Sequence, residues 1–275
     1  MRIVLTGSSS GIGRALAERL LAHGHQVWGI ARSDQSAFVL GSGGAFHAAR
    51  CNVADWSQVE LAAREILSVW PEIDALVTCA GIQGAIGRTV TIDPAQWTAT
   101  VRANLDGTFH AIRAFQAALL RAPRRAKIVC FSGGGATKAR PNFSAYAAAK
   151  AAVVRLVETV AEEERAAPLD INAVAPGAIN TRLTAEVVAL GPGVVGEAEY
   201  QAAVKQTAEG GAPIERALDL VEWLLSPASD GISGRLLSAP WDPWPALARH
   251  KDELARSDTY TLRRIVPADR GQKWA

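Results

Sequence analysis

The chain of 275 residues is 49% hydrophobic and 20% charged, which is enough apolar sequence for the core of one α/β domain. Its 29 basic and 27 acidic residues are well mixed, and the net charge of +2 argues against nucleic acid or an anionic membrane as a partner. Three cysteines without metal-binding spacing, no signal sequence and no apolar run of about 18 residues predict reduced thiols, no metal and a cytoplasmic location.

Short apolar runs alternate along the chain with longer segments of helical period, the pattern of βα units wound around a parallel sheet. Strands are expected at residues 2–6, 26–31, 75–79, 127–132 and 170–175, and the rhythm adds weaker ones at 45–50 and 235–238. Helices are expected at residues 12–21, 57–70, 94–120, 145–166 and 214–225. These elements predict a single-domain α/β protein with a doubly wound parallel sheet of about seven strands flanked by helices.

The first strand is followed by TGSSSGIGRALAERL, which places Gly7, Gly11 and Gly13 in a turn that opens a helix. Without Cβ atoms the backbone can turn tightly and approach a pyrophosphate, and the N–H groups and dipole of the helix N-terminus favour its negative charge. A strand before the turn, a helix after it and a second strand about 20 residues on complete the context of a dinucleotide site.

The end of the second strand discriminates between the two nicotinamide cofactors. A carboxylate there binds the adenosine ribose 2′-OH, whereas an arginine accommodates a 2′-phosphate. The segment WGIARSD has Ala31 where the acid is expected and Arg32 next to it, which favours NADP(H). NAD(H) remains open, because Arg32 also fits a solvated surface residue and Asp34 also fits a ribose contact.

A tyrosine and a lysine lie four residues apart in SAYAAAK, at Tyr146 and Lys150. In a helix both side chains project from the same face, so they can share one substrate. A phenol titrates near pH ~10 in water, and an adjacent ammonium together with an oxidised nicotinamide ring stabilises the phenolate. The pair predicts a general acid or base for interconverting a carbonyl and an alcohol.

Taken in order, these motifs resemble the short-chain dehydrogenase/reductase family. The matching segments are TGSSSGIG at residues 6–13, RANLDG with Asn104, Ser132 after IVCF, Tyr146 with Lys150, and PGAINT at residues 176–181. The resemblance spans roughly residues 1–239 and implies a Rossmann fold for that part of the chain. Residues 240–275 would then form a C-terminal extension.

The resemblance also implies roles for individual residues. Tyr146 would be the catalytic acid/base, and Lys150 would hold the ribose hydroxyls and lower the tyrosine pKa. Asn104 would anchor a water in a proton relay, and Ser132 would orient the substrate oxygen. The residues implied to contact the cofactor, of which the last two would meet the nicotinamide carboxamide, are Gly7, Ser9, Ser10, Gly11, Ile12, Gly13, Arg32, Asn52, Val53, Ala80, Gly81, Tyr146, Lys150, Pro176, Gly177, Ile179 and Thr181.

Three positions depart from the family pattern. The family's serine usually stands thirteen residues before the tyrosine, where this chain has Gly133, but one extra residue in a loop with three consecutive glycines would return Ser132 to the site. Ser144 fits better as the N-cap of the tyrosine helix. Cys79 replaces an asparagine whose amide bonds neighbouring strands. Asn52 replaces an aspartate and can still accept a hydrogen bond from the adenine amino group.

Residues 182–211 follow the PGAINT turn, where this family builds a mobile substrate lid. Their Ala, Val and Gly content predicts an apolar cover with little fixed charge that excludes water from the hydride. In the loop before Tyr146, three side chains fit either contacts to a polar or acidic substrate or a solvated basic loop: Lys138, Arg140 and Asn142.

The extension at residues 240–275 contains Trp241, Trp244 and Trp274, and we expect it to pack on its own core or on a neighbouring subunit. By resemblance, the helices at 94–120 and 145–166 would pair copies of the chain into a homodimer or homotetramer. The other expected partner is a small carbonyl or alcohol substrate.

The leading hypothesis is an NADP(H)-dependent oxidoreductase that interconverts a secondary alcohol and a ketone, with Tyr146 transferring the proton. A second interpretation is an epimerase or dehydratase that retains its cofactor and oxidises its substrate only transiently. A third is a cofactor-binding sensor or scaffold without catalysis, an idea raised by Gly133 at the serine position.

Overall fold

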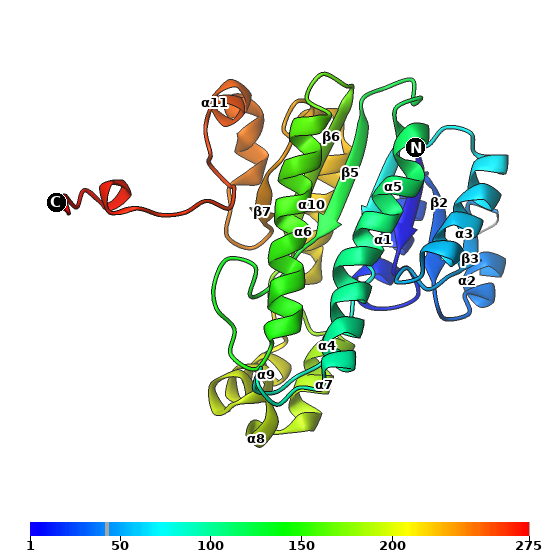
Figure 1. Cartoon of the computed structure of the whole chain (residues 1–275). Helices are drawn as coiled ribbons and strands as arrows, with labels where there is room; N and C mark the ends of the chain where they lie inside the picture. Colours follow the sequence, from blue (N-terminus) through cyan, green and yellow to red (C-terminus); the bar gives the residue numbers. More distant parts are fainter. Residues whose placement is uncertain (42–43, 275) are drawn as a thin grey trace.

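The computed structural model describes residues 1–41 and 44–274, and its centre is one parallel sheet of seven strands in the order β3-β2-β1-β4-β5-β6-β7 (Figure 1). The strands are β1 (Arg2–Thr6), β2 (Gln26–Ala31), β3 (Phe46–Arg50), β4 (Ala75–Thr78), β5 (Ala126–Phe131), β6 (Leu169–Ala175) and β7 (Leu236–Ser238). The doubly wound parallel sheet is therefore confirmed, and each strand lies within one residue of its predicted bounds.

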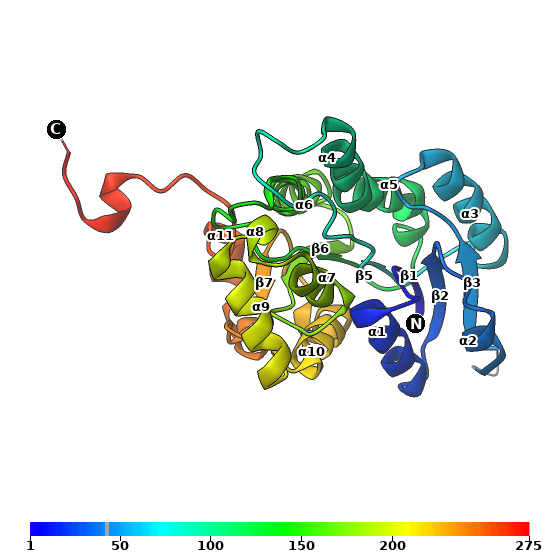
Figure 2. The same ribbon diagram turned by 90° about the horizontal axis from the view of Figure 1, so that it is seen from below.

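Helices cover both faces of the sheet (Figure 2). One face packs against α3 (Trp56–Val69), α5 (Gly107–Leu119) and α6 (Ser144–Glu163). The other packs against α1 (Gly11–Ala22) and α10 (Ile214–Leu225). Because both faces are covered, the central strands are mostly apolar, and every residue of β5 is buried, including Lys127 near its start.

The long helix expected at residues 94–120 is a continuous helical segment with a change of geometry inside it. It begins at the N-cap Asp93, whose side chain accepts from the N–H of Ala95 at 2.9 Å, with proline at the first helical position. After α4 (Pro94–Val101), a π-helical turn, η1 (Arg102–Asp106), separates it from α5. The sequence gives no periodic signal for such a turn, which is common at functional sites.

The lid region is more ordered and more charged than its composition predicted. It consists of three helices, α7 (Arg182–Leu190), α8 (Pro192–Val195) and α9 (Glu197–Glu209), which we call the cap. One of its charges, Glu199, forms an ion pair with Arg140. The expectation of a cover with little fixed charge was therefore wrong.

A short helix that the sequence analysis missed, α2 (Ser36–Gly41), lies between β2 and β3.

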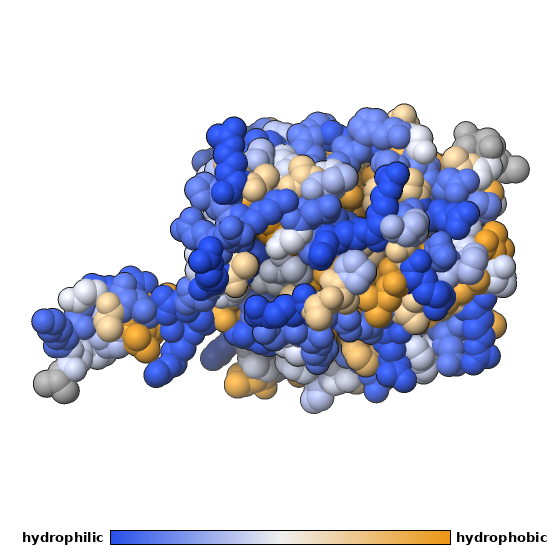
Figure 3. Space-filling model, turned by 90° about the horizontal axis from the view of Figure 1, so that it is seen from above, coloured by the Kyte–Doolittle hydropathy of each residue, from blue (hydrophilic) through white to orange (hydrophobic). Residues whose placement is uncertain are grey.

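The amino ends of the strands hold a buried charge network, at the opposite end of the sheet from the cap. Lys127 and Asp170 are paired across β5 and β6 at 2.8 Å, and both side chains are almost fully buried. Lys127 also contacts Asp230 at 2.7 Å. Buried charges need such partners, because an unpaired one costs several kcal/mol. Figure 3 shows the surface at this end, which is mostly hydrophilic.

The C-terminal extension divides into two parts. Its first part, residues 240–262, packs on the core through the 3-10 turn η3 (Trp244–His250) and α11 (Lys251–Arg256), and Trp244 is buried against Trp223. Residues 263–274 project away from the body, as Figures 1 and 3 show, and include a short 3-10 helix, η4 (Pro267–Arg270). Trp274 is 76% exposed, so this part contacts little of its own core.

Candidate active site

The loop between β1 and α1 has a shape that only glycine allows. Gly7 has φ +79°, and a Cβ there would lie 2.7 Å from the backbone nitrogen of Ala80. A Cβ on Gly13 would collide with the carbonyl oxygen of Gly7. Ser10, the N-cap of α1, makes no side-chain capping hydrogen bond, so the N–H groups of the first helical turn are available to an anion. This cradle fits the pyrophosphate of a dinucleotide.

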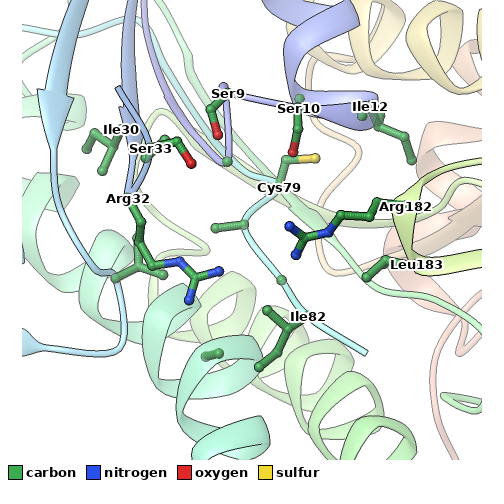
Figure 4. A pocket seen from close by; sticks show the side chains of 18 of the residues that line it. Ser9, Ser10, Ile12, Ile30, Arg32, Ser33, Cys79, Ile82, Arg182 and Leu183 are labelled. Carbon is green, nitrogen blue, oxygen red and sulfur yellow. The ribbon is translucent and has the colours of Figure 1, made fainter. Parts of the chain in front are cut away.

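A pocket opens beside this loop, at the carboxyl ends of the strands (Figure 4). The predicted cofactor residues in its wall are Gly7, Ser9, Ser10, Gly11, Ile12, Gly13, Arg32, Asn52, Val53, Ala80, Gly81 and Thr181. The wall also contains residues that the sequence analysis did not assign to the site: Ile30, Ala31, Ser33, Cys51, Cys79, Ile82, Ala103, Arg182 and Leu183. Tyr146, Lys150, Pro176, Gly177 and Ile179 are not part of this wall.

Two guanidinium groups reach into the pocket from opposite sides, Arg32 from the end of β2 and Arg182 from the start of α7 (Figure 4). Among residues 1–41 and 44–274, no ion pair engages Arg32, whereas Arg182 Nε lies 3.1 Å from a Glu186 carboxylate oxygen. Arg182 was missed because no motif marks it, although it directly follows Thr181. The pocket therefore presents positive charge at two points of its wall.

Asp34, the alternative ribose ligand, is turned toward its own helix. Its carboxylate accepts from the N–H of Ser36 at 2.9 Å and from the Ser36 hydroxyl at 2.8 Å. These hydrogen bonds lower the pKa of Asp34. The Asp34 side chain thus starts α2, and the residue is not among those that line the pocket.

The two departures near the cofactor pocket have local compensations. Cys79 donates its backbone N–H to the Thr6 carbonyl at 3.2 Å, and Ala80 N–H donates to the Thr6 hydroxyl, also at 3.2 Å. Thr6 therefore ties β1 to the end of β4 without an asparagine amide. Burial raises the pKa of the Cys79 thiol to about 12, which keeps it neutral. Asn52 Oδ1 accepts from Ala54 N–H at 3.2 Å and has one lone pair left for a ligand.

Asn104 lies in the π-helical turn and is fully buried. Its amide nitrogen donates to the carbonyl of Ile82 at 2.9 Å, and its amide oxygen accepts from the Ile82 N–H at 3.3 Å. This pair of bonds fixes the strand-end loop that carries Gly81 into the pocket. A Cβ on Gly81 would lie 2.7 Å from Asn104 Oδ1 and 3.5 Å from Lys150 Nζ, so the pocket wall directly adjoins both predicted catalytic residues.

Tyr146 and Lys150 are both buried on α6, as expected for one helix face. Lys150 Nζ lies 5.7 Å from the centroid of the Tyr146 ring and donates to the Phe131 carbonyl at 2.9 Å. Burial lowers the pKa of Lys150 to about 8. Burial also raises the pKa of Tyr146, and the charge of Arg140 opposes that rise. Arg140 is therefore a second cation near the phenol, at 5.8 Å from the ring centroid, and its charge favours the phenolate.

Ser132 points away from the tyrosine. Its hydroxyl donates to the Lys150 carbonyl at 3.1 Å, and its N–H continues the β6 pairing through the Val174 carbonyl at 2.8 Å. Slack from the glycines comes only after this last strand-like residue, so it cannot return Ser132 to the phenol. Consecutive residues of an extended chain face opposite sides, and here Gly133 faces Tyr146. A Cβ on Gly133 would lie 2.6 Å from Tyr146 Oη.

The turn at residues 176–181 brings only its last residue to the pocket. Thr181 lines the pocket and caps α7, its hydroxyl accepting from Leu183 N–H at 3.2 Å. Ile179 is buried and forms an isolated bridge with Gly211, which lies two residues beyond the end of the cap. Gly177 lies against Pro240, where the C-terminal extension starts.

Ser144 is not the N-cap of α6, contrary to the sequence prediction. Phe143 takes that position, and the Ser144 hydroxyl accepts from the Trp97 indole at 3.3 Å.

Proteins similar to this chain are named as dehydrogenases and reductases. The family model for short chain dehydrogenase matches residues 1–190. The chain is 31% identical over 185 residues to the 3-oxoacyl-[acyl-carrier-protein] reductase FabG of Escherichia coli, which covers 66% of this chain and 74% of the relative. It is 28% identical over 274 residues to the short chain dehydrogenase pigC of Monascus ruber, covering 96% of this chain and 86% of that one.

Solved structures show the same fold. The aldohexose dehydrogenase of Thermoplasma acidophilum in ligand-free form is 26% identical and superposes with a TM-score of 0.74, covering 86% of this chain and 91% of that one. A variant of the actinorhodin polyketide ketoreductase with NADPH gives a TM-score of 0.76 at 22% identity, covering 86% and 94% of the two chains.

Within the described part of the chain, no helix is long and apolar enough to cross a membrane, and no cluster of metal-ligating side chains occurs.

Proposed function

Since this chain belongs to the short-chain dehydrogenase/reductase family, we propose that it interconverts a ketone and a secondary alcohol with NADP(H), and that Tyr146 transfers the proton. The observation that carries the proposal is the junction at Gly81. This residue lines the cofactor pocket, and a Cβ on it would come within 3.5 Å of Lys150 Nζ and 2.7 Å of Asn104 Oδ1. The pocket thus adjoins Lys150, which α6 carries together with Tyr146, and this contact supports the proposal.

The preference for NADP(H) rests on Arg32. A guanidinium at the end of β2 without an ion pair in the described residues suits a 2′-phosphate, since arginine binds phosphate oxygens with two parallel hydrogen bonds. Asp34 is already bonded to Ser36, which weakens the case for a ribose diol there. The actinorhodin polyketide ketoreductase variant, whose fold this chain shares, was solved with NADPH, which is consistent with this preference.

The nicotinamide, when bound, supplies or accepts the hydride at the substrate carbon. Gly7, Gly13 and the open N-terminus of α1 would hold the pyrophosphate of the cofactor, and Arg32 would hold its 2′-phosphate. Tyr146 Oη would give a proton to the substrate oxygen during reduction and take it back during oxidation. Lys150, which is buried with its pKa lowered to about 8, would bind ribose hydroxyls beside Gly81. The cap would exclude water from this region.

The first experiment is a fluorescence titration of the purified protein with NADPH and with NADH, in wild type and in Arg32→Ala. We expect tighter binding of NADPH and a loss of about 10- to 100-fold in the variant for NADPH alone, as for one charge-assisted hydrogen-bonded contact. Arg64→Ala is the control, because Arg64 lies on α3 with its side chain 72% exposed, outside the pocket wall. Equal affinities for the two cofactors in wild type would reject the NADP(H) assignment.

A panel of ketones with the preferred reductant then tests the reaction. Oxidation of the cofactor by at least one ketone, lost in Tyr146→Phe, is the expected result. A cofactor that stays bound through purification, without net turnover, would favour the epimerase or dehydratase instead. Binding of NADPH without reduction of any ketone would favour a sensor or scaffold.

A further inference from the structure

The cap is fastened to the loop before α6 at three neighbouring residues of that loop. Phe143 is fully buried in a small apolar cluster with Val187, Val195 and Ala203 of the cap. Asn142 Nδ2 donates to the Val195 carbonyl at 3.1 Å. The Arg140 guanidinium donates to the Glu199 carboxylate from Nε at 3.2 Å and from Nη2 at 3.0 Å. The loop that leads into the tyrosine helix is thereby joined to α9.

Arg140 stands between the cap and the tyrosine. Its guanidinium stacks on the Phe143 ring, 3.8 Å from the centroid, and lies 5.8 Å from the centroid of the Tyr146 ring. Its side chain is 17% exposed and that of Glu199 is 32% exposed. A charge at this distance and burial is only partly screened by water. One arginine thus contacts the cap and acts on the phenol electrostatically.

Few other charges face Tyr146. Its own helix contributes Lys150, at 5.7 Å from the ring centroid, and the end of β4 contributes the neutral Cys79 thiol. The loop contributes Arg140, and α9 contributes Glu199 behind it. Among residues 1–41 and 44–274 no side chain donates a hydrogen bond to Tyr146 Oη, and Gly133 stands where a hydroxyl would be expected to do so. The phenol therefore depends on nearby charge more than on hydrogen bonding.

We propose that Arg140 is a positioning residue that couples closure of the cap to the ionisation of Tyr146, with Glu199 setting how much of the arginine charge reaches the phenol. The proposal deepens the function proposed above and rests on Tyr146 as the proton-transfer residue. When the cap is closed, the ion pair holds the guanidinium over the aromatic rings. When the cap opens, Glu199 leaves, and the arginine is free to move with the loop.

The ion pair predicts opposite effects of its two members. Removal of Arg140 takes away a cation that favours the phenolate, so the pKa of Tyr146 should rise by about 0.5 to 2 pH units for a charge near 6 Å. Removal of Glu199 leaves that cation uncompensated, so the pKa should fall by a smaller amount. Both changes should loosen the cap, because each breaks the same ion pair.

The test is an ultraviolet titration of tyrosinate in wild type, Arg140→Gln and Glu199→Gln. Each protein is compared with its own Tyr146→Phe counterpart, which removes the signal of the two other tyrosines, Tyr200 and Tyr260. Arg140→Lys should return the pKa toward wild type because it restores the charge. Lys138→Gln is the matched control, since it removes an exposed charge from the same loop and should cause a smaller shift.

Cap opening is measured in the same proteins as the rate of trypsin cleavage after Arg182 and Lys205. We expect faster cleavage in Arg140→Gln and Glu199→Gln, together with tyrosine pKa values displaced in opposite directions. Displacement in the same direction, or no displacement despite a looser cap, would reduce the ion pair to a structural link and overturn the proposal. Neither readout uses a ketone or NADPH. A protein that shows the opposite displacements but reduces no ketone would contradict only the proposed function.

Discussion

The β1–α1 loop and the β5–α6 loop occupy equivalent places in the fold, each leading from the carboxyl end of a strand into a helix, yet the sequence predicted them unequally. The first loop is determined by backbone contacts at Gly7 and Gly13, which the glycine pattern reveals. The second depends on which way one side chain points, and a shift of one residue reversed that direction at Ser132. Glycine spacing reports backbone geometry reliably, whereas residue type alone does not report side-chain direction.

The largest expected effect separates the two loops by function. Tyr146→Phe should lower kcat by about 10²- to 10⁴-fold, the usual contribution of a general acid or base, because it removes the hydroxyl and keeps the ring. Cofactor affinity, set by the β1–α1 loop, should stay at the wild-type value. Steady-state kinetics and a fluorescence titration measure both quantities. Substantial residual turnover would show that the β5–α6 side of the site does not transfer the proton.

The next effect concerns the β1–α1 loop. Gly13→Ala places a methyl group against the Gly7 carbonyl and should weaken NADPH binding by about 5- to 150-fold, corresponding to an overpacking cost of about 1–3 kcal/mol. The control is Gly24→Ala, where the added Cβ meets nothing within 4 Å and only the φ of +78° is strained. Gly24→Ala should therefore lower the melting temperature without altering NADPH affinity. Equal effects of both variants on affinity would contradict the cradle.

A smaller effect tests the β5–α6 loop itself. Gly133→Ala puts a Cβ 2.6 Å from Tyr146 Oη, so the phenol must shift and kcat should fall by roughly 10-fold, about 1.4 kcal/mol of transition-state stabilisation. Its neighbour Gly134 has nothing within 4 Å of an added Cβ, and Gly134→Ala should leave kcat unchanged. Steady-state kinetics of the two alanine variants measure this difference. Equal kcat values would show that Gly133 does not face the reaction centre.

The smallest effect is expected at Ser132. Its hydroxyl bonds the Lys150 carbonyl, so Ser132→Ala should lower the free energy of unfolding by about 1 kcal/mol and leave kcat nearly unchanged. Denaturant unfolding and steady-state kinetics measure the two quantities. A loss of 100-fold or more in kcat, in the range of acid–base contributions, would instead return Ser132 to the substrate and undo the contrast between the loops.

Sequence patterns predicted the sheet well because apolar runs and turn residues are local signals. The end of the second strand pointed to Arg32 and the family resemblance pointed to Gly81, and both residues line the pocket. The cap helices were missed because Ala and Gly content obscured their period. The Arg140–Glu199 ion pair joins residues 59 positions apart, so no local pattern reports it. Arg182, which also lines the pocket, was missed because no motif marks it.

The π-helical turn at Arg102–Asp106 also sets a helical phase. The N–H of Gly107 bonds the Arg102 carbonyl, five residues back, so the segment contains one residue more than a regular α-helix of the same turns. Each residue of an α-helix rotates the side chain by about 100°, so the extra residue changes the direction of the side chains that follow it. On the two sides of the turn, α4 packs on α6 and α5 packs on α3. Deletion of one residue here would re-aim Asn104 or every side chain beyond it. The length of this segment therefore constrains the direction of the α5 side chains as well as that of Asn104.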